Sequence, residues 1–166
     1  MDLKSAFKGQ YHAGLAQIRQ CIERCPDDLW SAQAGVAPRT FWRIAYHAIF
    51  YTHLYLMNKH EDFQPWEKDV WHASVLWDDD ERGTPPQETT YTQAEMISYL
   101  DLVDAGVDGW MDAMDLEAAH SGIPWYNISK IDHQVVNIRH MGIHIGQLQE
   151  LLYAKGIDVD WISRRP

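Results

Sequence analysis

Cysteine and long apolar runs are both scarce in this chain. It has two cysteines in 166 residues, too few for the disulfide framework that stabilises many small secreted domains. The longest uncharged apolar run, residues 44–58, includes His47 and His53 and is shorter than the roughly 20 residues that span a membrane. The first residues also lack the apolar segment of a signal peptide. We therefore expect a cytoplasmic protein without a membrane-spanning helix.

Positive charge is the third shortage. Lys and Arg total 14 against 24 Asp and Glu, which gives a formal net charge of −10 with histidine neutral. A chain of this charge is repelled by the phosphate backbone of nucleic acids and by anionic lipid surfaces. We therefore expect neither nucleic acid nor a membrane as a partner.

Aromatic side chains, by contrast, are abundant. The counts of Trp 8 and Tyr 8 supply bulky rings that must fill a core, line a pocket or form an interface. A length of 166 residues corresponds to one domain, since a domain commonly has about 100 to 200 residues. We expect residues 1–166 to form a single domain with one core.

The spacing of apolar residues predicts helices. Apolar side chains recur at steps of three and four along four segments, which is the period of one helix face. The predicted helices cover about residues 2–24, 41–59, 92–116 and 129–155. Thr40 is a suitable N-cap for the second, and Thr92 with Glu95 matches a capping box for the third. No segment alternates like a strand, so we predict an all-α four-helix bundle.

A long connection separates the second and third predicted helices. Residues 60–91 lose the helical period and contain Pro65, Gly83 and the acidic run at residues 78–81. A connection of this length can cross the whole bundle, which lets the helices on either side run in the same direction. We expect it to contain no more than one short helix.

Three histidines are candidate metal ligands. His140 and His144 lie four residues apart on the last predicted helix, so both rings project from one face and can bind one ion. The same face extends back to Asn137 and His133, forming a polar row among apolar neighbours. His47 lies in the most apolar helix, where an imidazole has little polar company. From spacing alone, hydrogen-bonded core histidines remain the simpler interpretation, because the chain has nine histidines.

Two segments around these histidines resemble the DinB/YfiT-like superfamily. They are FWRIAYHA at residues 41–48 and NIRHMGIHIGQL at residues 137–148. The order and spacing of the predicted helices agree with that family over nearly the whole chain. The resemblance implies that His47, His140 and His144 hold a divalent transition metal (Zn²⁺, Ni²⁺ or Fe²⁺) at one end of the bundle.

Three imidazole ligands leave at least one coordination position open, whereas structural zinc sites are usually closed by four protein ligands. An open position is typical of a site that activates water or a thiol or polarises a carbonyl. Other metal chemistries lack their motifs. Met141 follows His140 where a zinc protease has glutamate. A di-iron centre needs two Glu-x-x-His motifs and two further glutamates, and only Glu117 to His120 matches one such motif. There is no Cys-x-x-Cys-His sequence for covalent haem attachment.

Several neighbouring residues keep two interpretations. His133 and Asn137 either contact the site or have structural roles. Aromatic residues of the long connection either cover the open coordination position or, more simply, pack the connection onto the helices; they are Trp66, Trp71, His72 and Trp77. Trp125 and Tyr126, in the last connection, have the same ambiguity.

Smaller features have simple interpretations. Cys21 and Cys25 lie one turn apart near a helix end and are expected to be core or partly exposed thiols. The run at residues 78–81 is expected to be a solvated loop tip. Gly142 and Gly146 suggest close helix packing or a dimer contact.

Three functions are compatible with these observations. The leading one, from the resemblance, is a metal-dependent enzyme for a small-molecule substrate, either a hydrolase or a thiol S-transferase. The second is a metal-binding or ligand-binding protein without turnover. The third is a homodimer in which the metal only links the second and fourth helices.

Overall fold

The computed structural model describes residues 2–36, 38–70, 73–77 and 90–165. In these ranges the regular structure is helical, and the only β-type pairing is one isolated bridge between Gln33 and Thr40. The elements are α1 (Leu3–Arg24), α2 (Asp27–Trp30), α3 (Phe41–Tyr55), the 3-10 helix η1 (His60–Asp62), α4 (Gln93–Ala113) and α5 (Lys130–Tyr153). The predicted all-α class is confirmed.

The predicted helix starts are correct and have the expected caps. The Thr40 hydroxyl accepts from the Arg43 amide at 3.3 Å at the start of α3. At the start of α4, the Thr92 hydroxyl accepts from the Glu95 amide at 3.2 Å and the Glu95 carboxylate accepts from the Thr92 amide at 2.9 Å. These reciprocal bonds pair two amides that a helix start leaves open.

Helices α3 and α4 end a few residues earlier than predicted, and the short helix α2 was missed altogether. After α3, the carbonyls of Met57 and Asn58 accept from Lys130 Nζ at 3.2 and 2.8 Å, so a side chain of α5 binds the backbone where the helix has ended. The Asn58 side chain also donates to the carbonyl of Ala113 at 3.2 Å, where α4 ends. These ends are set by contacts between segments far apart in the sequence.

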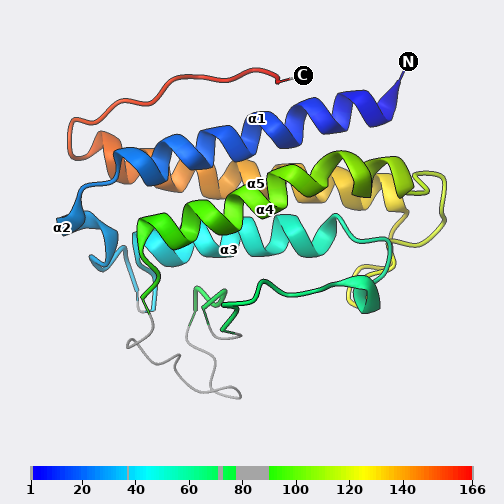
Figure 1. Ribbon diagram of the computed structural model, residues 1–166, viewed down its shortest axis with the longest axis horizontal. Helices are drawn as coiled ribbons and strands as arrows, with labels where there is room; N and C mark the ends of the chain where they lie inside the picture. The colour runs from blue at the N-terminus through cyan, green and yellow to red at the C-terminus, as the bar shows by residue number, and fades with distance from the viewer. Residues whose placement is uncertain (1, 37, 71–72, 78–89, 166) are drawn as a thin grey trace.

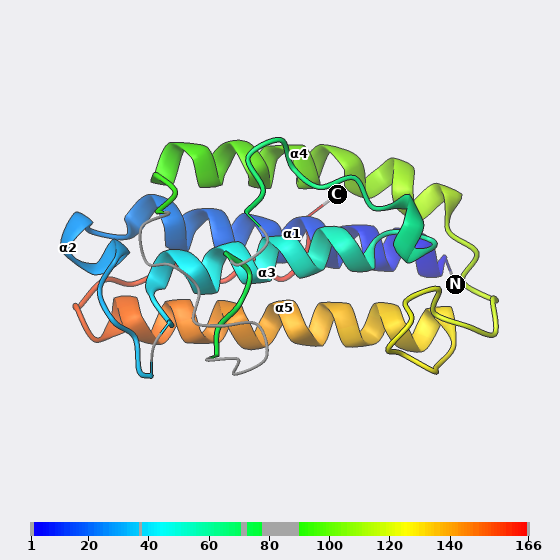
Figure 2. The ribbon, with the colours of Figure 1, turned by 90° about the horizontal axis from the view of Figure 1, so that it is seen from below.

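The long helices α1, α3, α4 and α5 lie side by side (Figures 1 and 2). Helices α1 and α5 run in one direction and α3 and α4 in the other, as Figure 1 shows. Helix α3 packs mainly against α5, and α1 packs against α4 and α5. The connection after α3 first passes through η1 at one end of the helices, and α3 and α4 run in the same direction, as a connection of this length allows.

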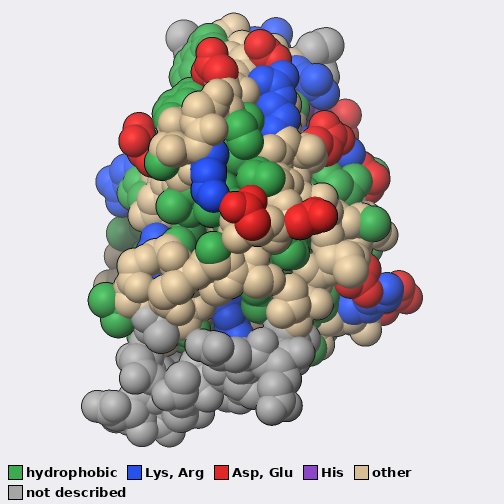
Figure 3. Space-filling view, turned by 90° about the vertical axis from the view of Figure 1, so that its left-hand side faces the viewer, with side chains coloured by type: hydrophobic (Ala, Val, Ile, Leu, Met, Phe, Trp, Pro, Cys, Tyr) green, Lys and Arg blue, Asp and Glu red, His purple; other side chains and the backbone are tan. Residues whose placement is uncertain are grey.

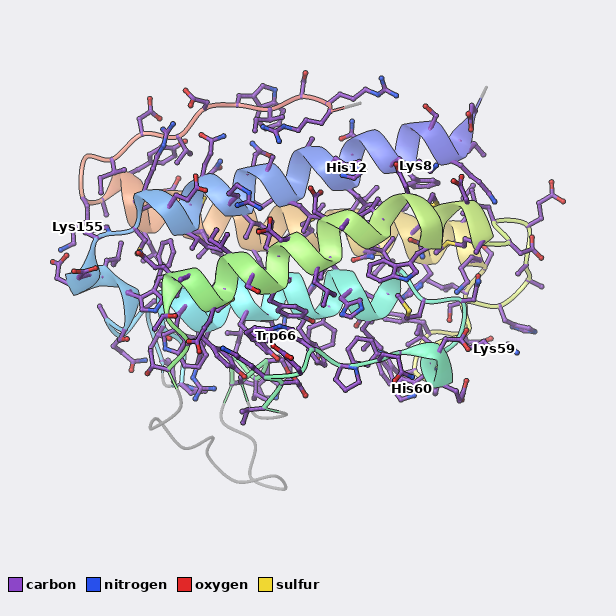
Figure 4. All side chains as sticks on the ribbon, in the orientation of Figure 1. Lys8, His12, Lys59, His60, Trp66 and Lys155 are labelled. Atoms are coloured by element: carbon purple, nitrogen blue, oxygen red, sulfur yellow. The ribbon has the colours of Figure 1, made fainter. Side chains whose placement is uncertain are left out.

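The long connection is anchored by aromatic packing. Trp66 is 5% exposed, and its ring stacks on Tyr99 of α4 with centroids 4.9 Å apart. Figure 4 shows Trp66 between the connection and the helices. For Trp66 the packing interpretation is therefore confirmed, whereas Trp71, His72 and residues 78–81 lie outside the described residues.

The two cysteines are buried, and charged side chains of both signs lie on the surface (Figure 3). Cys21 and Cys25 are buried free thiols, as expected, and burial raises the pKa of each to about 12. Lys8 pairs with Asp112 at 2.7 Å across α1 and α4 (Figure 4). Charges of both signs also share the end of the molecule seen in Figure 3.

Gly142 and Gly146 do not mediate close helix packing. A Cβ atom added at either glycine would meet nothing within 4 Å among the described residues. The prediction of close packing within the chain is therefore wrong for the part described, and a dimer contact stays a prediction. No helix in that part has the length and apolar character needed to cross a membrane.

Candidate metal centre

Three imidazoles from two helices meet at one point. His47 comes from α3, His140 and His144 come from α5, and one ring nitrogen of each lies within 4.8 Å of the others. His140 Nε2 is 3.0 Å from His47 Nε2 and 3.1 Å from His144 Nε2. The three histidines predicted from the sequence are therefore close enough to one another to bind one metal ion.

The centre lies along the side of the helices. His47 is in the second turn of α3, and His140 and His144 are near the middle of α5. This position differs from the end of the bundle that the resemblance implies. Spacing within one helix fixes which side chains share a face, but the partner helix decides where along that face they meet.

The backbone of the long connection fixes the tautomer of His47. Its Nδ1 lies 2.6 Å from the carbonyl oxygen of Ser74. Because a carbonyl oxygen only accepts, Nδ1 carries the proton of the neutral ring. The lone pair of His47 is therefore on Nε2, which faces the other two imidazoles.

A series of hydrogen bonds between side chains fixes the tautomer of His144 in the same way. His144 Nδ1 lies 2.9 Å from Gln147 Oε1, and Arg39 Nη2 donates to the same oxygen at 2.9 Å. A guanidinium only donates, so Oε1 is correctly the amide oxygen and His144 Nδ1 carries the proton. The lone pair of His144 is again on Nε2.

This donor set fits a cation. Two Nε2 lone pairs face His140 Nε2, and a single proton there could satisfy only one of them at a time. A metal ion would accept all three, leaving the proton of His140 on Nδ1. Tetrahedral coordination with metal–nitrogen distances of about 2.0 to 2.1 Å requires nitrogens about 3.3 Å apart, close to the two separations measured from His140 Nε2. The hydrogen bonds to Ser74 and Gln147 thus orient His47 and His144 before any ion binds.

Burial keeps the three rings neutral. His47 is 4% exposed and His144 is 7% exposed. Desolvation, followed by the charge that His144 would carry, lowers the pKa of His47 to about 3 and that of His140 to about 4. Desolvation also lowers the pKa of His144. Metals bind neutral imidazole, so these ligands are available at neutral pH without first losing protons.

The centre opens into a cavity of about 570 Å³. Besides the three histidines, its lining consists of Arg39, Tyr51, Tyr55, Leu76, Trp77, Trp125 and Tyr126. Trp77 is 49% exposed and Trp125 is 53% exposed, so both border its entrance. For Trp77, Trp125 and Tyr126 the structure favours the interpretation that they cover the site, because all three line this cavity. The cavity has room for a small molecule next to the histidines.

The remaining candidates lie elsewhere. His133 and Asn137 are fully buried but do not line the cavity. His133 packs between Tyr55 and Tyr126, with ring centroids 4.8 and 5.0 Å away. The Asn137 amide donates to the Thr52 carbonyl at 3.3 Å. Their surroundings favour the structural interpretation.

Sequence reasoning missed Arg39, Gln147 and the Ser74 carbonyl. Gln147 follows His144 by three residues, and Tyr51 follows His47 by four, so helical spacing would have placed both near the site. Arg39 and Ser74 lie in connections, where no period predicts a position.

Comparisons of this chain with models of protein families, with curated proteins and with solved structures found no match.

Proposed function

We propose that this chain is a metal-dependent enzyme that resembles the DinB/YfiT-like superfamily, with a four-helix-bundle fold and a small-molecule substrate. His47, His140 and His144 would hold one divalent ion. The observation that supports this most directly is the pair of fixed Nε2 lone pairs that face a third imidazole nitrogen beside an accessible cavity. The shared direction of α3 and α4 supports the proposed fold.

An ion bound by three neutral imidazoles supplies a Lewis acid that lowers the pKa of a water molecule or a thiol. The ligand set suits Zn²⁺, Ni²⁺ or Fe²⁺ rather than Mg²⁺ or Ca²⁺, which prefer oxygen ligands. Ser74 and Gln147 act as positioning residues, because each holds the Nδ1 proton of one ligand and so aims its Nε2.

The cavity restricts the reaction class. Among the described residues that line it there is no Asp, Glu, Ser or Cys, so this part of the chain offers no carboxylate base and no serine or cysteine nucleophile there. The attacking group would come from water or from a substrate thiol. This favours hydrolysis of a small molecule or transfer to a thiol.

The same observation also supports a second function. With no carboxylate, serine or cysteine in the described lining, the ion would serve to hold α3 against α5, the two helices that supply its ligands. The protein would then be a metal-binding or dimerising protein without turnover.

Metal analysis tests the site. Protein purified without added metal should contain about one equivalent of a transition metal. His47→Ala, His140→Ala and His144→Ala should each lose it, and His120→Ala, an exposed histidine after α4, should retain it. Metal retained by all three ligand variants would contradict the site.

Turnover separates the two functions. Folded protein should convert an ester, an amide or a thiol-plus-electrophile pair, and chelation should abolish that activity. If no substrate turns over and metal removal instead unfolds the protein or dissociates a dimer, the structural function is correct.

A further inference from the structure

The cavity beside the three histidines has one formally charged side chain among its described lining residues, Arg39. The others are aromatic, aliphatic or imidazole side chains. The chain as a whole carries a net charge of −10. A cavity whose charged side chain is a cation is therefore unexpected from the overall excess of acidic residues.

Arg39 has no carboxylate partner within the ranges that the structure describes. Its one side-chain hydrogen bond there goes to the neutral Gln147 amide, at 2.9 Å. The other surface cations of this chain often do have acidic partners, as in the pairs of Arg24 with Asp160 at 2.6 Å and of Lys155 with Asp28 at 2.7 Å. A guanidinium has five N–H donors, so most of those of Arg39 remain available to a ligand.

The backbone of Arg39 is held in a tight turn before α3. Its amide donates to the Val36 carbonyl at 3.2 Å, and its carbonyl accepts from the Ala34 amide at 2.9 Å. Gly35 within this turn has φ +96, a conformation that glycine adopts without strain. The bond to Gln147, whose amide oxygen also accepts from His144, then holds the side chain beside α5. Arg39 is therefore a partly preorganised donor, which lowers the entropy lost when it binds a ligand.

Flat side chains line the same cavity as this cation. Trp77 and Trp125 are each about half exposed, and both line the same cavity as Arg39. Covering such rings with an apolar or aromatic ligand body removes apolar surface from water. The cavity thus combines a site for negative charge with walls suited to a flat body.

We propose that the cavity selects small organic anions, whose carboxylate or phosphate group binds Arg39 while the apolar body packs against Trp77 and Trp125. The inference deepens the proposed function by naming a substrate class, and it rests on that function only in taking this cavity as the substrate site. A guanidinium pairs with carboxylate and with phosphate in the same forked geometry, so the cavity chemistry fits both head groups.

Calorimetric titration of metal-stripped protein tests anion selection without the metal. The probes are benzoate, phenylphosphonate and the neutral benzamide, which share a ring and differ in charge. At least one anion should bind about tenfold more tightly than benzamide, and the tighter of the two identifies the preferred head group. Equal affinity for all three probes, including no binding of any, would overturn the proposal.

Variants at position 39 test the residue. Arg39→Met should weaken anion binding about tenfold to a hundredfold, the range for a charge-assisted hydrogen bond, and change benzamide binding less than twofold. Arg39→Lys retains the charge without the planar fork and should recover part of the preference, which keeps the test usable if Arg39→Met does not fold. Arg139→Met removes the same charge from an exposed position of α5 outside the cavity and should have no effect.

The same titrations with zinc-loaded protein separate this proposal from the metal centre. If zinc does not bind but Arg39-dependent selection of anions persists, the metal proposal fails and this one stands. If the anions bind only with zinc, and equally well in Arg39→Met, the ion is the anion site and the role of Arg39 is wrong.

Discussion

His47 Nε2 lies 3.0 Å from His140 Nε2, although 93 positions separate the two residues in the sequence. The contact exists only where α3 packs against α5. The centre is therefore a product of tertiary packing, and metal binding and folding should stabilise one another. The groups that orient the imidazoles, the Ser74 carbonyl in the long connection and Gln147 on α5, are not ligands themselves, so changing them offers tests that leave the ligands intact.

Gln147→Leu removes the acceptor that holds His144 Nδ1. Losing a hydrogen-bond partner of a metal-bound histidine typically costs tenfold to a hundredfold in affinity, because the ring is no longer held in its ligating tautomer and orientation. We expect zinc affinity to fall by about that factor, as measured by competition with a chromophoric chelator. Gln149→Leu, which changes a neighbouring glutamine that does not bond to a ligand, should bind zinc as the wild type does. Unchanged affinity in Gln147→Leu would show that the amide does not position His144.

The stability of the metal-free protein should fall in mild acid. Burial lowers the pKa of both His53 and His133 to about 4, and the unfolded chain binds these protons near pH 6.5. Between about pH 6.5 and 4 the unfolded state holds more protons than the folded state, so the free energy of unfolding decreases as pH falls. Each histidine should contribute on the order of 2 to 3 kcal/mol over that window.

Urea unfolding at pH 7.5 and at pH 5 measures this effect. His133→Phe replaces one buried imidazole with an apolar ring between Tyr55 and Tyr126, so the difference between the two pH values should shrink. His120→Phe, at an exposed position, should leave the difference unchanged. A wild-type protein equally stable at both pH values would show that these histidines are not buried in their neutral forms.

How far the sequence could predict this molecule depends on whether a feature is local. The caps at Thr40 and Thr92 and the facing of His140 and His144 follow from spacing within one helix, and the structure has them. The end of α3 depends on Lys130, which lies far along the chain and binds the carbonyls that follow the helix. No local pattern contains that information.

The same distinction applies to the site. His47 could be named from its place in an apolar helix, but its hydrogen bond to Ser74 depends on where the long connection returns. Arg39 lies in a turn without hydrophobic periodicity, and its role follows from a bond to Gln147 on a distant helix. Trp66 and Trp77 belong to the same connection, yet one is buried and the other half exposed, a difference that composition does not predict.

Lys130→Met should destabilise the fold strongly. Lys130 is 2% exposed, and its ammonium donates to the carbonyls of Met57, Asn58 and Ser121. Methionine fills similar space but leaves these buried acceptors without their donor, at a cost of about 2 to 4 kcal/mol. Chemical denaturation measures the loss. Lys59→Met, at the exposed lysine labelled in Figure 4, should change stability by no more than about 0.5 kcal/mol. Equal effects of the two substitutions would mean that the hydrogen bonds of the Lys130 ammonium to these carbonyls do not stabilise the fold.

Substitutions of Trp66 and Trp125 should have different effects on stability and on ligand binding. Trp66 is 5% exposed and stacks on Tyr99, so Trp66→Ala should lower the free energy of unfolding by about 3 to 5 kcal/mol, through lost burial and a cavity. Trp125 is 53% exposed at the cavity, so Trp125→Ala should change stability by less than about 1 kcal/mol. The same Trp125→Ala protein should bind benzoate more weakly, because the ring that covers the apolar body of the ligand is gone. Urea unfolding of both variants measures the free energy of unfolding, and calorimetric titration measures their affinity for benzoate. If Trp125→Ala lost as much stability as Trp66→Ala while binding benzoate normally, Trp125 would be a packing residue of its connection and not part of the cavity wall.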